Sequence, residues 1–432
     1  MKLLIQHGRV VDPVSGTVSI QDLYIENGKV VQLEKDIRQE ADQVIDADGL
    51  VVCPGLVDMH VHLRDPGLTY KEDIFTGTAA AAHGGVTSVA CMANTDPVVD
   101  NPEQIRYVKD KAAQANGVHV YPIAAVSMGM RGEEPSDADA LKKAGAIALS
   151  DDGCNVDNAN LMRDVMIHAK RLELPVLCHC EDTTMVEGRA VNEGSVSRQL
   201  WLEGRPAIAE EIMVMRDAML AEETGAAVHI CHVSTAGSVE IIRQFKKKGV
   251  AITCETCPQY FTLTEDEVLE QGSLARVNPP LRTKLDVEAI LEGLRDGTID
   301  VIATDHAPHS VEEKAKPLAE APSGMVGLET ALGVTLTALY HTGFMDLSDI
   351  LKKMTFHPAC ILRIPKGRLS LGGEADFTIF SPDEEWTVEP DQFASKGRNT
   401  PFKGRKLKGR VKYTIVGGRV VYGDEGGRAD VV

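Results

Sequence analysis

The sequence predicts an α/β fold, in which a TIM (β/α)8 barrel stands beside a small β-sandwich domain built from both chain termini. Three observations support this fold. Short β-rich segments alternate with helical patterns in the middle of the chain, the two flanks consist of β-hairpin patterns, and polar side chains gather where the central strands end. The predicted domain boundaries are 1–53 and 366–432 for the two parts of the sandwich and 54–365 for the barrel.

The two flanks carry the same turn signal. Asn27-Gly28 in "YIENGKVVQL" and Gly417-Gly418 in "YTIVGGRVVYG" are dipeptides typical of two-residue hairpin turns. Neither flank is large enough to bury a generous core alone. We therefore expect both ends of the chain to combine in one β domain.

The central region contains eight strand candidates. They lie at 55–63, 86–94, 118–126, 146–153, 175–182, 227–234, 251–259 and 300–309, and amphipathic helices are predicted between them, for example at 160–174 and 209–225. Eight such units in one region are typical of a TIM barrel. A doubly wound open sheet is the alternative, but no GxGxxG pattern follows the first strand.

Composition limits the function classes. The chain has 432 residues, of which 43% are hydrophobic and 25% charged, values that are ordinary for a globular protein. A net charge of -19 argues against a nucleic-acid partner. No apolar run approaches the roughly 18 residues of a membrane span, and the start lacks a signal-peptide pattern, so a cytoplasmic location is expected. Nine scattered cysteines indicate reduced thiols rather than a disulfide framework.

The first central strand, in "GLVDMHVHLRDPG" (55–67), has an unusual polar face. Strand alternation puts Asp58, His60, His62 and Arg64 on one side and Met59, Val61 and Leu63 on the other. Polar groups aligned on an otherwise buried strand need partners or a function. One interpretation is an edge strand with one face exposed to solvent. The more specific interpretation is a metal-binding site.

Other polar residues gather at the C-terminal ends of the predicted strands. The full set is His60, His62, Asn94, Asp152, His179, His232, Asp305 and His309. A barrel brings all strand ends to one face, where catalytic groups sit in this fold. A single buried histidine is usually structural, but four of them together with two carboxylates favour a metal centre.

The cysteines next to these residues are expected to be packing residues. If His179 and His232 face the barrel interior, alternation turns Cys178, Cys180 and Cys231 outward toward the helices. The "CETC" segment (254–257) lacks a second cysteine pair, so strand-end thiols are favoured there over a zinc knuckle.

Two long motifs carry a family resemblance. "DMHVHLRDPG" and "ATDHAPHSVEEK", with "CMANTDP", "LSDDG", "CHCED", "CHVSTAGS", "RVNPPLR" and "NTPFKG" in order between and after them, span essentially the whole chain. In these motifs the chain resembles the cyclic amidohydrolases, most closely the class I bacterial dihydroorotase family. One departure is Ser323 in "APSGMVG", where the family leads us to expect an aromatic or other apolar residue.

The resemblance implies two Zn²⁺ ions per chain. His60, His62 and Asp305 would hold one ion, His179 and His232 the other, and Asp152 and a hydroxide would bridge them. Hydantoinases, dihydropyrimidinases and allantoinases carry a carboxylated lysine on the fourth strand, whereas this chain has "ALSDDG" there. Asp151 is the alternative to Asp152 within that segment.

The resemblance also implies the reaction and its partners. The expected activity is the reversible interconversion of N-carbamoyl-L-aspartate and L-dihydroorotate in de novo pyrimidine biosynthesis, with Asp305 as catalytic base and then acid. The implied substrate-binding residues are His62, Arg64, Asn94, Asn278, His309, Ser323 and Gly324. A homodimer is expected, and association with aspartate transcarbamoylase is a further expectation, with no nucleic-acid or membrane partner.

Two alternatives remain open at this point. A hydantoinase-like or dihydropyrimidinase-like enzyme would share the barrel and the metals, but it should carry the strand lysine and lack Arg64. An inactive scaffold for aspartate transcarbamoylase should have lost metal ligands, and every expected ligand is present in this chain.

Overall fold

The central region forms a closed barrel. The computed structural model describes residues 1–115 and 117–424. Its parallel barrel strands are β6 (Leu56–Val61), β7 (Val86–Cys91), β8 (His119–Pro122), β9 (Val176–Cys178), β12 (Val228–Ile230), β13 (Ile252–Thr256) and β14 (Val301–Ile302). The segment expected as the fourth strand contributes only bridges from Leu149 to Ala124 and Val176, and a bridge between Val61 and His306 closes the ring. The predicted barrel is confirmed.

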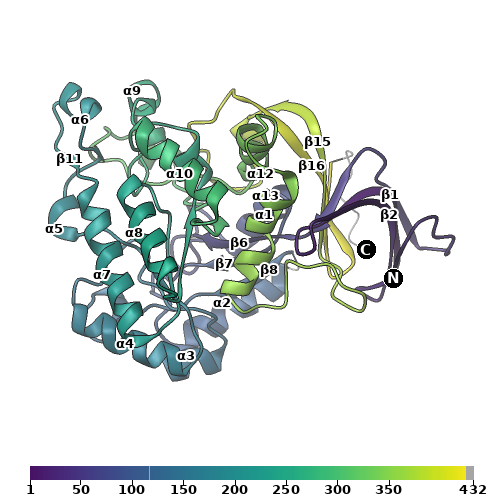
Figure 1. The fold of residues 1–432 in the computed structure, drawn as a ribbon, viewed down its shortest axis with the longest axis horizontal. Coiled ribbons are helices and arrows are strands. Elements are labelled where there is room, and N and C mark those ends of the chain that lie inside the picture. The colour runs from purple at the N-terminus through teal and green to yellow at the C-terminus, as the bar shows by residue number, and fades with distance from the viewer. Residues whose placement is uncertain (116, 425–432) are drawn as a thin grey trace.

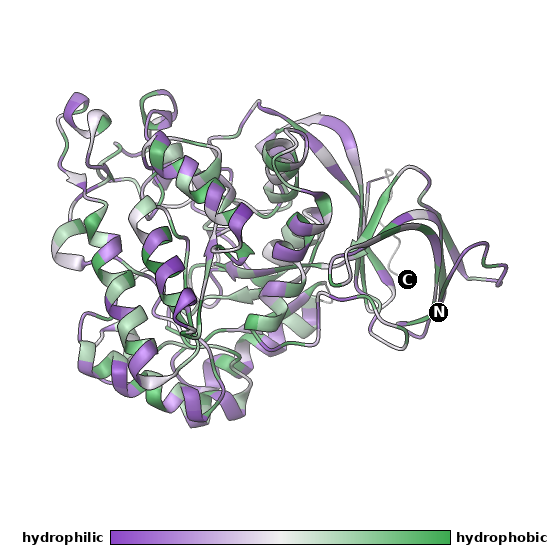
Figure 2. Cartoon of the chain, in the orientation of Figure 1, coloured by the Kyte–Doolittle hydropathy of each residue, from purple (hydrophilic) through white to green (hydrophobic). Residues whose placement is uncertain are grey.

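Helices surround the strands on the outside (Figure 1). The longer ones are α1 (Ile74–His83), α2 (Pro102–Ala115), α3 (Ala138–Ala144), α4 (Ala159–Arg171), α7 (Ile208–Thr224), α8 (Ala236–Lys247), α10 (Lys284–Asp296) and α13 (Leu347–Met354). Shorter elements are α5 (Thr183–Val186), α6 (Ser195–Gln199), α9 (Glu267–Gln271), α11 (Val311–Lys314), α12 (Ala331–Thr335), α14 (Phe356–Ile361), β10 (Val191–Asn192) and β11 (Gly204–Arg205). Figure 2 shows hydrophobic and hydrophilic stretches alternating along these helices, as expected when one side packs inward.

The barrel interior has its own apolar cluster. Ala90, Leu177 and Ala303 belong to it, whereas Cys178 packs in the larger cluster between strands and helices. Met59 and Cys231 also lie in the interior cluster, so the expectation that these two face outward is wrong. The cause is local. The β6–β7 ladder shifts register between Asp58 and Val61, and His232 has a left-handed φ of 35°, so strict alternation fails at both places.

Both ends of the chain join in one β domain, as predicted. Its strands are β1 (Lys2–Asp12), β2 (Thr17–Glu26), β3 (Lys29–Glu34), β4 (Gln43–Asp46), β5 (Val51–Pro54), β15 (Phe377–Thr387), β16 (Lys406–Val416) and β17 (Arg419–Gly423). They form a continuous eight-stranded sheet in which β15 pairs with β5. Leu3 and Leu23 share its core with Phe377 and Ile415, so neither end encloses a core alone. Figure 1 shows this sheet at one side of the barrel.

The two predicted hairpin turns are present. Asn27 and Gly28 join β2 to β3 with φ values of 50° and 77°, and Gly417 and Gly418 join β16 to β17 with 55° and 75°. Positive φ at both central residues is the conformation that a two-residue hairpin needs, and glycine adopts it without strain.

Candidate metal centre

Six predicted ligands converge at the C-terminal end of the barrel. Their ligand atoms form two groups, in each of which all atoms lie within 4.8 Å of one another: His60, His62 and Asp305 in one, and Asp152, His179 and His232 in the other. All six residues are buried. His60 lies near the end of β6, and the other five follow β6, β9, β12, β14 and the segment at Leu149, so the barrel itself positions them.

Asp152 lies between the two groups. Its Oδ2 is 3.4 Å from Nε2 of both His60 and His62, and its Oδ1 is 3.5 Å from His179 Nδ1 and 3.3 Å from His232 Nε2. Each carboxylate oxygen therefore faces a different group of imidazoles. This is the arrangement expected of a carboxylate shared by two metal ions.

The carboxylate of the neighbouring Asp151 forms hydrogen bonds away from the histidines. Its Oδ1 accepts hydrogen bonds from the backbone N–H groups of Val126 (2.8 Å) and Ser127 (3.2 Å), and its Oδ2 accepts one from the Ser127 hydroxyl (2.5 Å). Asp151 therefore anchors the segment after β8 instead of facing the histidines.

The outer nitrogens of three histidines are held by oxygen acceptors. His60 Nδ1 lies 2.5 Å from Glu255, His62 Nδ1 lies 2.8 Å from Asn94 Oδ1, and His179 Nε2 lies 3.3 Å from Glu181. A carboxylate or amide oxygen fixes the ring proton on the nitrogen that faces it, which leaves the opposite nitrogen free to bind a metal. His60 Nε2 is buried with no hydrogen-bond partner among the described residues, as an imidazole nitrogen meant for a metal would be.

Glu255 was not among the site residues predicted from the sequence. It is fully buried on β13, between the two cysteines of "CETC", and its carboxylate contacts both His60 and His229 (3.3 Å). Burial works against its ionisation, but His60 and His229 outweigh that effect and hold the pKa of the carboxyl well below its usual range. A single glutamate inside an apolar segment was the only signal in the sequence.

The surroundings of Asp152 favour the ionised form of its carboxylate. Burial alone would raise the pKa of Asp152, but His60, His179 and His232 hold it well below the usual range. Buried imidazoles and carboxylates with free ligand atoms match the donors that Zn²⁺ prefers, so these residues fit a metal pair. His232 and Asp305 have positive φ values of 35° and 49°, local strain of the kind that clusters at functional sites.

A cavity of about 230 Å³ opens over the two groups. Every predicted substrate-binding residue lines it, namely His62, Arg64, Asn94, Asn278, His309, Ser323 and Gly324. Asp58 does not line this cavity. Its carboxylate accepts hydrogen bonds from the backbone N–H groups of His60 and Thr304.

Arg64 is a buried cation that has no anionic partner among the residues that the structure describes. Its side chain donates from Nε to the carbonyl of Pro308 (3.2 Å), and a terminal nitrogen lies 3.4 Å from His309 Nε2. No carboxylate of residues 1–115 or 117–424 forms an ion pair with it. Asp65 pairs instead with Lys111 (3.2 Å). A buried, unpaired guanidinium in a cavity wall is suited to an anionic ligand.

The cavity wall beside Arg64 is held by a hydrogen bond between two loops. His309 Nε2 donates to the Ser323 carbonyl (2.8 Å), and burial, together with Arg64 and Lys71, lowers the pKa of His309 to about 3. Gly324 has a φ of 133°, and a Cβ there would lie 2.7 Å from that of Ala307, so only glycine fits. The Ser323 hydroxyl accepts a hydrogen bond from Arg276 Nε at 3.3 Å.

The two asparagines are bonded to protein groups as well as lining the cavity. Asn94 binds His62 through Oδ1, and its Nδ2 donates to the Asp152 carbonyl (3.2 Å). Asn278 Nδ2 lies 3.3 Å from His179 Nε2, and its Oδ1 accepts a hydrogen bond from Arg205. Both amides therefore support metal-site residues.

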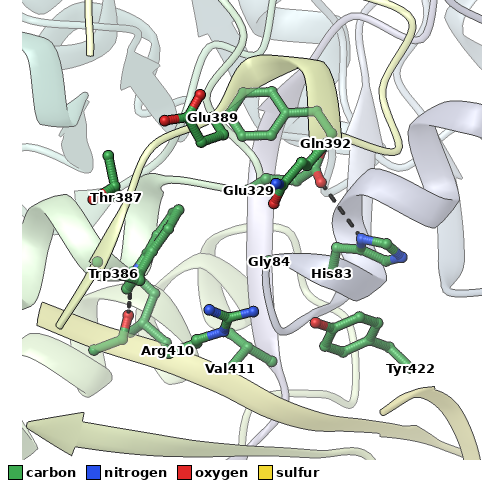
Figure 3. A pocket seen from close by; sticks show the side chains of 14 residues that line it. His83, Gly84, Glu329, Trp386, Thr387, Glu389, Gln392, Arg410, Val411 and Tyr422 are labelled. Atoms are coloured by element: carbon green, nitrogen blue, oxygen red, sulfur yellow. Dashed lines mark hydrogen bonds and ion pairs between the residues drawn. The ribbon is translucent and has the colours of Figure 1, made fainter. Parts of the chain in front are cut away.

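A second cavity, of about 120 Å³, lies where the barrel meets the terminal sheet (Figure 3). His83 lies 3.5 Å from Glu329 and stacks on Tyr422 with ring centroids 4.4 Å apart, while Trp386 Nε1 donates to the Gly409 carbonyl (3.0 Å). Of these contacts, the one between His83 and Tyr422 joins the barrel to the sheet, so we assign this cavity to the contact between the two domains. Within the described ranges, no helix combines the length and apolar character required to cross a bilayer.

The comparisons with known proteins agree with this geometry. Residues 49–238 match the family described as dihydro-orotase-like. A dihydroorotase of Pelotomaculum thermopropionicum is 53% identical over 98% of this chain and 99% of that protein. A dihydroorotase of Acetivibrio thermocellus is 50% identical over 97% of this chain and 98% of that protein.

Solved structures share the same fold. The L-hydantoinase (dihydropyrimidinase) of Arthrobacter aurescens superposes with a TM-score of 0.88 at 26% identity, over 97% of this chain and 95% of that one. The dihydropyrimidinase of Brevibacillus agri, at 23% identity and a TM-score of 0.83 over 97% and 95% of the two chains, supports the fold alone. These two dihydroorotases are 53% and 50% identical to this chain over nearly its full length. The chain therefore belongs to the dihydroorotase family.

Proposed function

We propose that this chain is a dihydroorotase that interconverts N-carbamoyl-L-aspartate and L-dihydroorotate in de novo pyrimidine biosynthesis, with two Zn²⁺ ions per chain. The observation that carries the proposal is the buried Arg64, which is paired with no carboxylate of the described residues. It lies in the wall of a cavity that opens over two groups of metal-ligating side chains. Dihydroorotate is a cyclic imide with a carboxylate, so it matches both features at once.

The proposed ligand assignment follows the two groups. One ion would be held by His60, His62 and Asp305, the other by His179 and His232, and Asp152 would be shared. When bound, the metal ions activate a water molecule as the nucleophile and polarise the carbonyl oxygen under attack.

Asp305 is the proposed catalytic base and acid. Its carboxylate lines the cavity, with Oδ1 3.0 Å from His62 Nε2. In hydrolysis it takes the proton of the attacking water and passes it to the ring nitrogen as the C–N bond breaks. In ring closure the same carboxyl works in reverse and water is released. Closure consumes one proton, because a dianion becomes a monoanion.

The substrate carboxylate is proposed to bind at Arg64. The two terminal nitrogens of its guanidinium can form a bidentate pair with a carboxylate, since only Nε donates to Pro308. His309 stands beside it, and its low pKa keeps that ring neutral near pH 7. The remaining cavity residues, among them Asn278 and the Ser323–Gly324 segment, would position the ring of the substrate.

The domain boundaries and the assembly remain part of the proposal. We assign 54–365 to the barrel and 1–53 with 366–432 to the terminal domain, which is supported by the pairing of β5 with β15. A homodimer, association with aspartate transcarbamoylase and a cytoplasmic location are proposed from the family alone.

The proposed function is tested by turnover of three substrates by the purified, metal-loaded protein. L-Dihydroorotate should be hydrolysed to N-carbamoyl-L-aspartate, whereas dihydrouracil and hydantoin, which lack the carboxylate, should be turned over hardly at all. Preference for either uncharged ring would assign the chain a hydantoinase-like activity instead. The absence of turnover on all three by fully metallated protein would favour a scaffold role.

A further inference from the structure

We propose that Lys314 is a positioning residue for the substrate-binding wall of the cavity. Its buried ammonium group joins the two loops that carry Asn278 and Ser323–Gly324, and it adds positive charge behind the place where the substrate anion binds. The inference rests on the proposed function and extends it to a residue that does not line this cavity.

Lys314 ends the short helix α11, in the "VEEK" of the second long motif, and only 4% of its surface is exposed. Its Nζ donates hydrogen bonds to the carbonyls of Pro322 (3.0 Å), Gly324 (3.0 Å) and Arg276 (3.3 Å). Within residues 1–115 and 117–424, no carboxylate forms an ion pair with this lysine. A lysine ammonium has three donors, and all three go to backbone carbonyls.

The three carbonyls come from the two loops of the wall: that of Arg276 from the loop that carries Asn278, and those of Pro322 and Gly324 from the loop that carries Ser323. Gly324 N–H donates to the same Arg276 carbonyl (2.9 Å), so Lys314 sits at the junction of the two segments. Between the other two carbonyls lies Ser323, whose own carbonyl accepts the hydrogen bond from His309. Loss of the ammonium would leave the Pro322 carbonyl without a donor among the described residues and would remove one of two hydrogen bonds from each of the Gly324 and Arg276 carbonyls, which would loosen the segment that orients His309.

A purely structural role explains this arrangement less well. Burial, and to a lesser extent Arg276, lowers the pKa of Lys314 to about 7, so keeping its charge is costly. An apolar side chain at this position would avoid that cost if packing were the only requirement. Arg64 adds positive charge near His309, at the same end of the cavity, whereas Lys71 there is already paired with Glu313 (3.0 Å). A bound carboxylate would offset the cost of Lys314 and Arg64 together.

The test compares two buried lysines. Lys353 is 5% exposed on α13, and its Nζ also donates to a backbone carbonyl, that of Ile299 (2.6 Å). Burial lowers the pKa of Lys353 as well, so Lys353→Met is a matched control that does not line the cavity. Lys314→Met, Lys353→Met and the wild type are compared in zinc content, melting temperature, and kcat and KM for L-dihydroorotate.

We expect both variants to lose thermal stability and to keep their zinc. Lys314→Met should raise KM by roughly tenfold or more with kcat within about threefold of wild type, because binding of the anion is lost rather than chemistry. Lys353→Met should leave KM unchanged. A KM for Lys314→Met within about twofold of wild type, or an equal rise in Lys353→Met, would overturn the proposal.

Two further outcomes are decisive. If Lys314→Met does not fold, Lys314→Gln is measured in its place, because glutamine keeps a donor and removes the charge. If that variant also fails to fold, Lys314 is structural and the proposal is wrong. A wild type that carries zinc but does not turn over dihydroorotate would refute the proposed function itself, a result distinct from an unchanged KM in an active enzyme.

Discussion

Arg64 provides the sharpest test of substrate choice. The Arg64→Met substitution keeps most of the aliphatic stem and removes the guanidinium. Because Arg64 has a φ of 57° and methionine is subject to the same restriction, the backbone strain is unchanged. Arg64 belongs to neither metal-ligand group, so we expect two zinc ions to remain bound.

The magnitude follows from the contacts. Nε of Arg64 is used by Pro308, which leaves the two terminal nitrogens for a bidentate pair with the substrate carboxylate. Two charge-assisted hydrogen bonds at about 1.5 kcal/mol each amount to about 3 kcal/mol. We therefore expect kcat/KM for L-dihydroorotate to fall by about a hundredfold.

The assay measures dihydroorotate hydrolysis at several substrate concentrations, with the zinc content determined on the same sample. Arg163→Met is the control, because it removes one positive charge from the exposed ion pair with Glu223. That variant should behave like the wild type. Normal dihydroorotate turnover by fully metallated Arg64→Met would refute the role of this residue as the carboxylate-binding group.

Four further substitutions test the metal centre. Asp152→Ala should lose at least one zinc ion and nearly all activity, whereas Asp151→Ala, which loses only backbone and Ser127 contacts, should keep more of both; the reverse order would contradict the bridging assignment. Asp305→Asn should lower kcat by about a hundredfold or more with a smaller change in KM, and a fully metallated variant with near-normal turnover would exclude it as the base. Glu255→Gln should weaken zinc binding by roughly tenfold to a hundredfold in a titration of metal-free protein, because the carboxylate that orients His60 is lost; an unchanged affinity would contradict this role.

Much of the fold could be predicted because its signals are local. The Asn27-Gly28 turn depends on two adjacent residues, and the pattern that predicted His62 and Arg64 at one site depends on a few neighbours in one segment. Where the backbone departs from regular geometry, the same rule failed. Cys231 faces the interior because the chain turns at His232.

Contacts between distant segments were harder to predict. Glu255 binds His60 across 195 positions of the sequence, and Lys314 binds Arg276 across 38, so neither pairing has a local pattern. The partner of Asn278 at His179 is 99 positions away. These residues are close only because the barrel brings the ends of its strands to one face.

Zinc content measured together with turnover tests the central claim most directly. The purified protein is assayed for bound zinc and for L-dihydroorotate hydrolysis before chelation, after chelation, and after zinc is restored. The account predicts two zinc ions per chain, loss of turnover in step with their removal, and recovery when zinc returns. Undiminished hydrolysis of dihydroorotate by metal-free protein would contradict it.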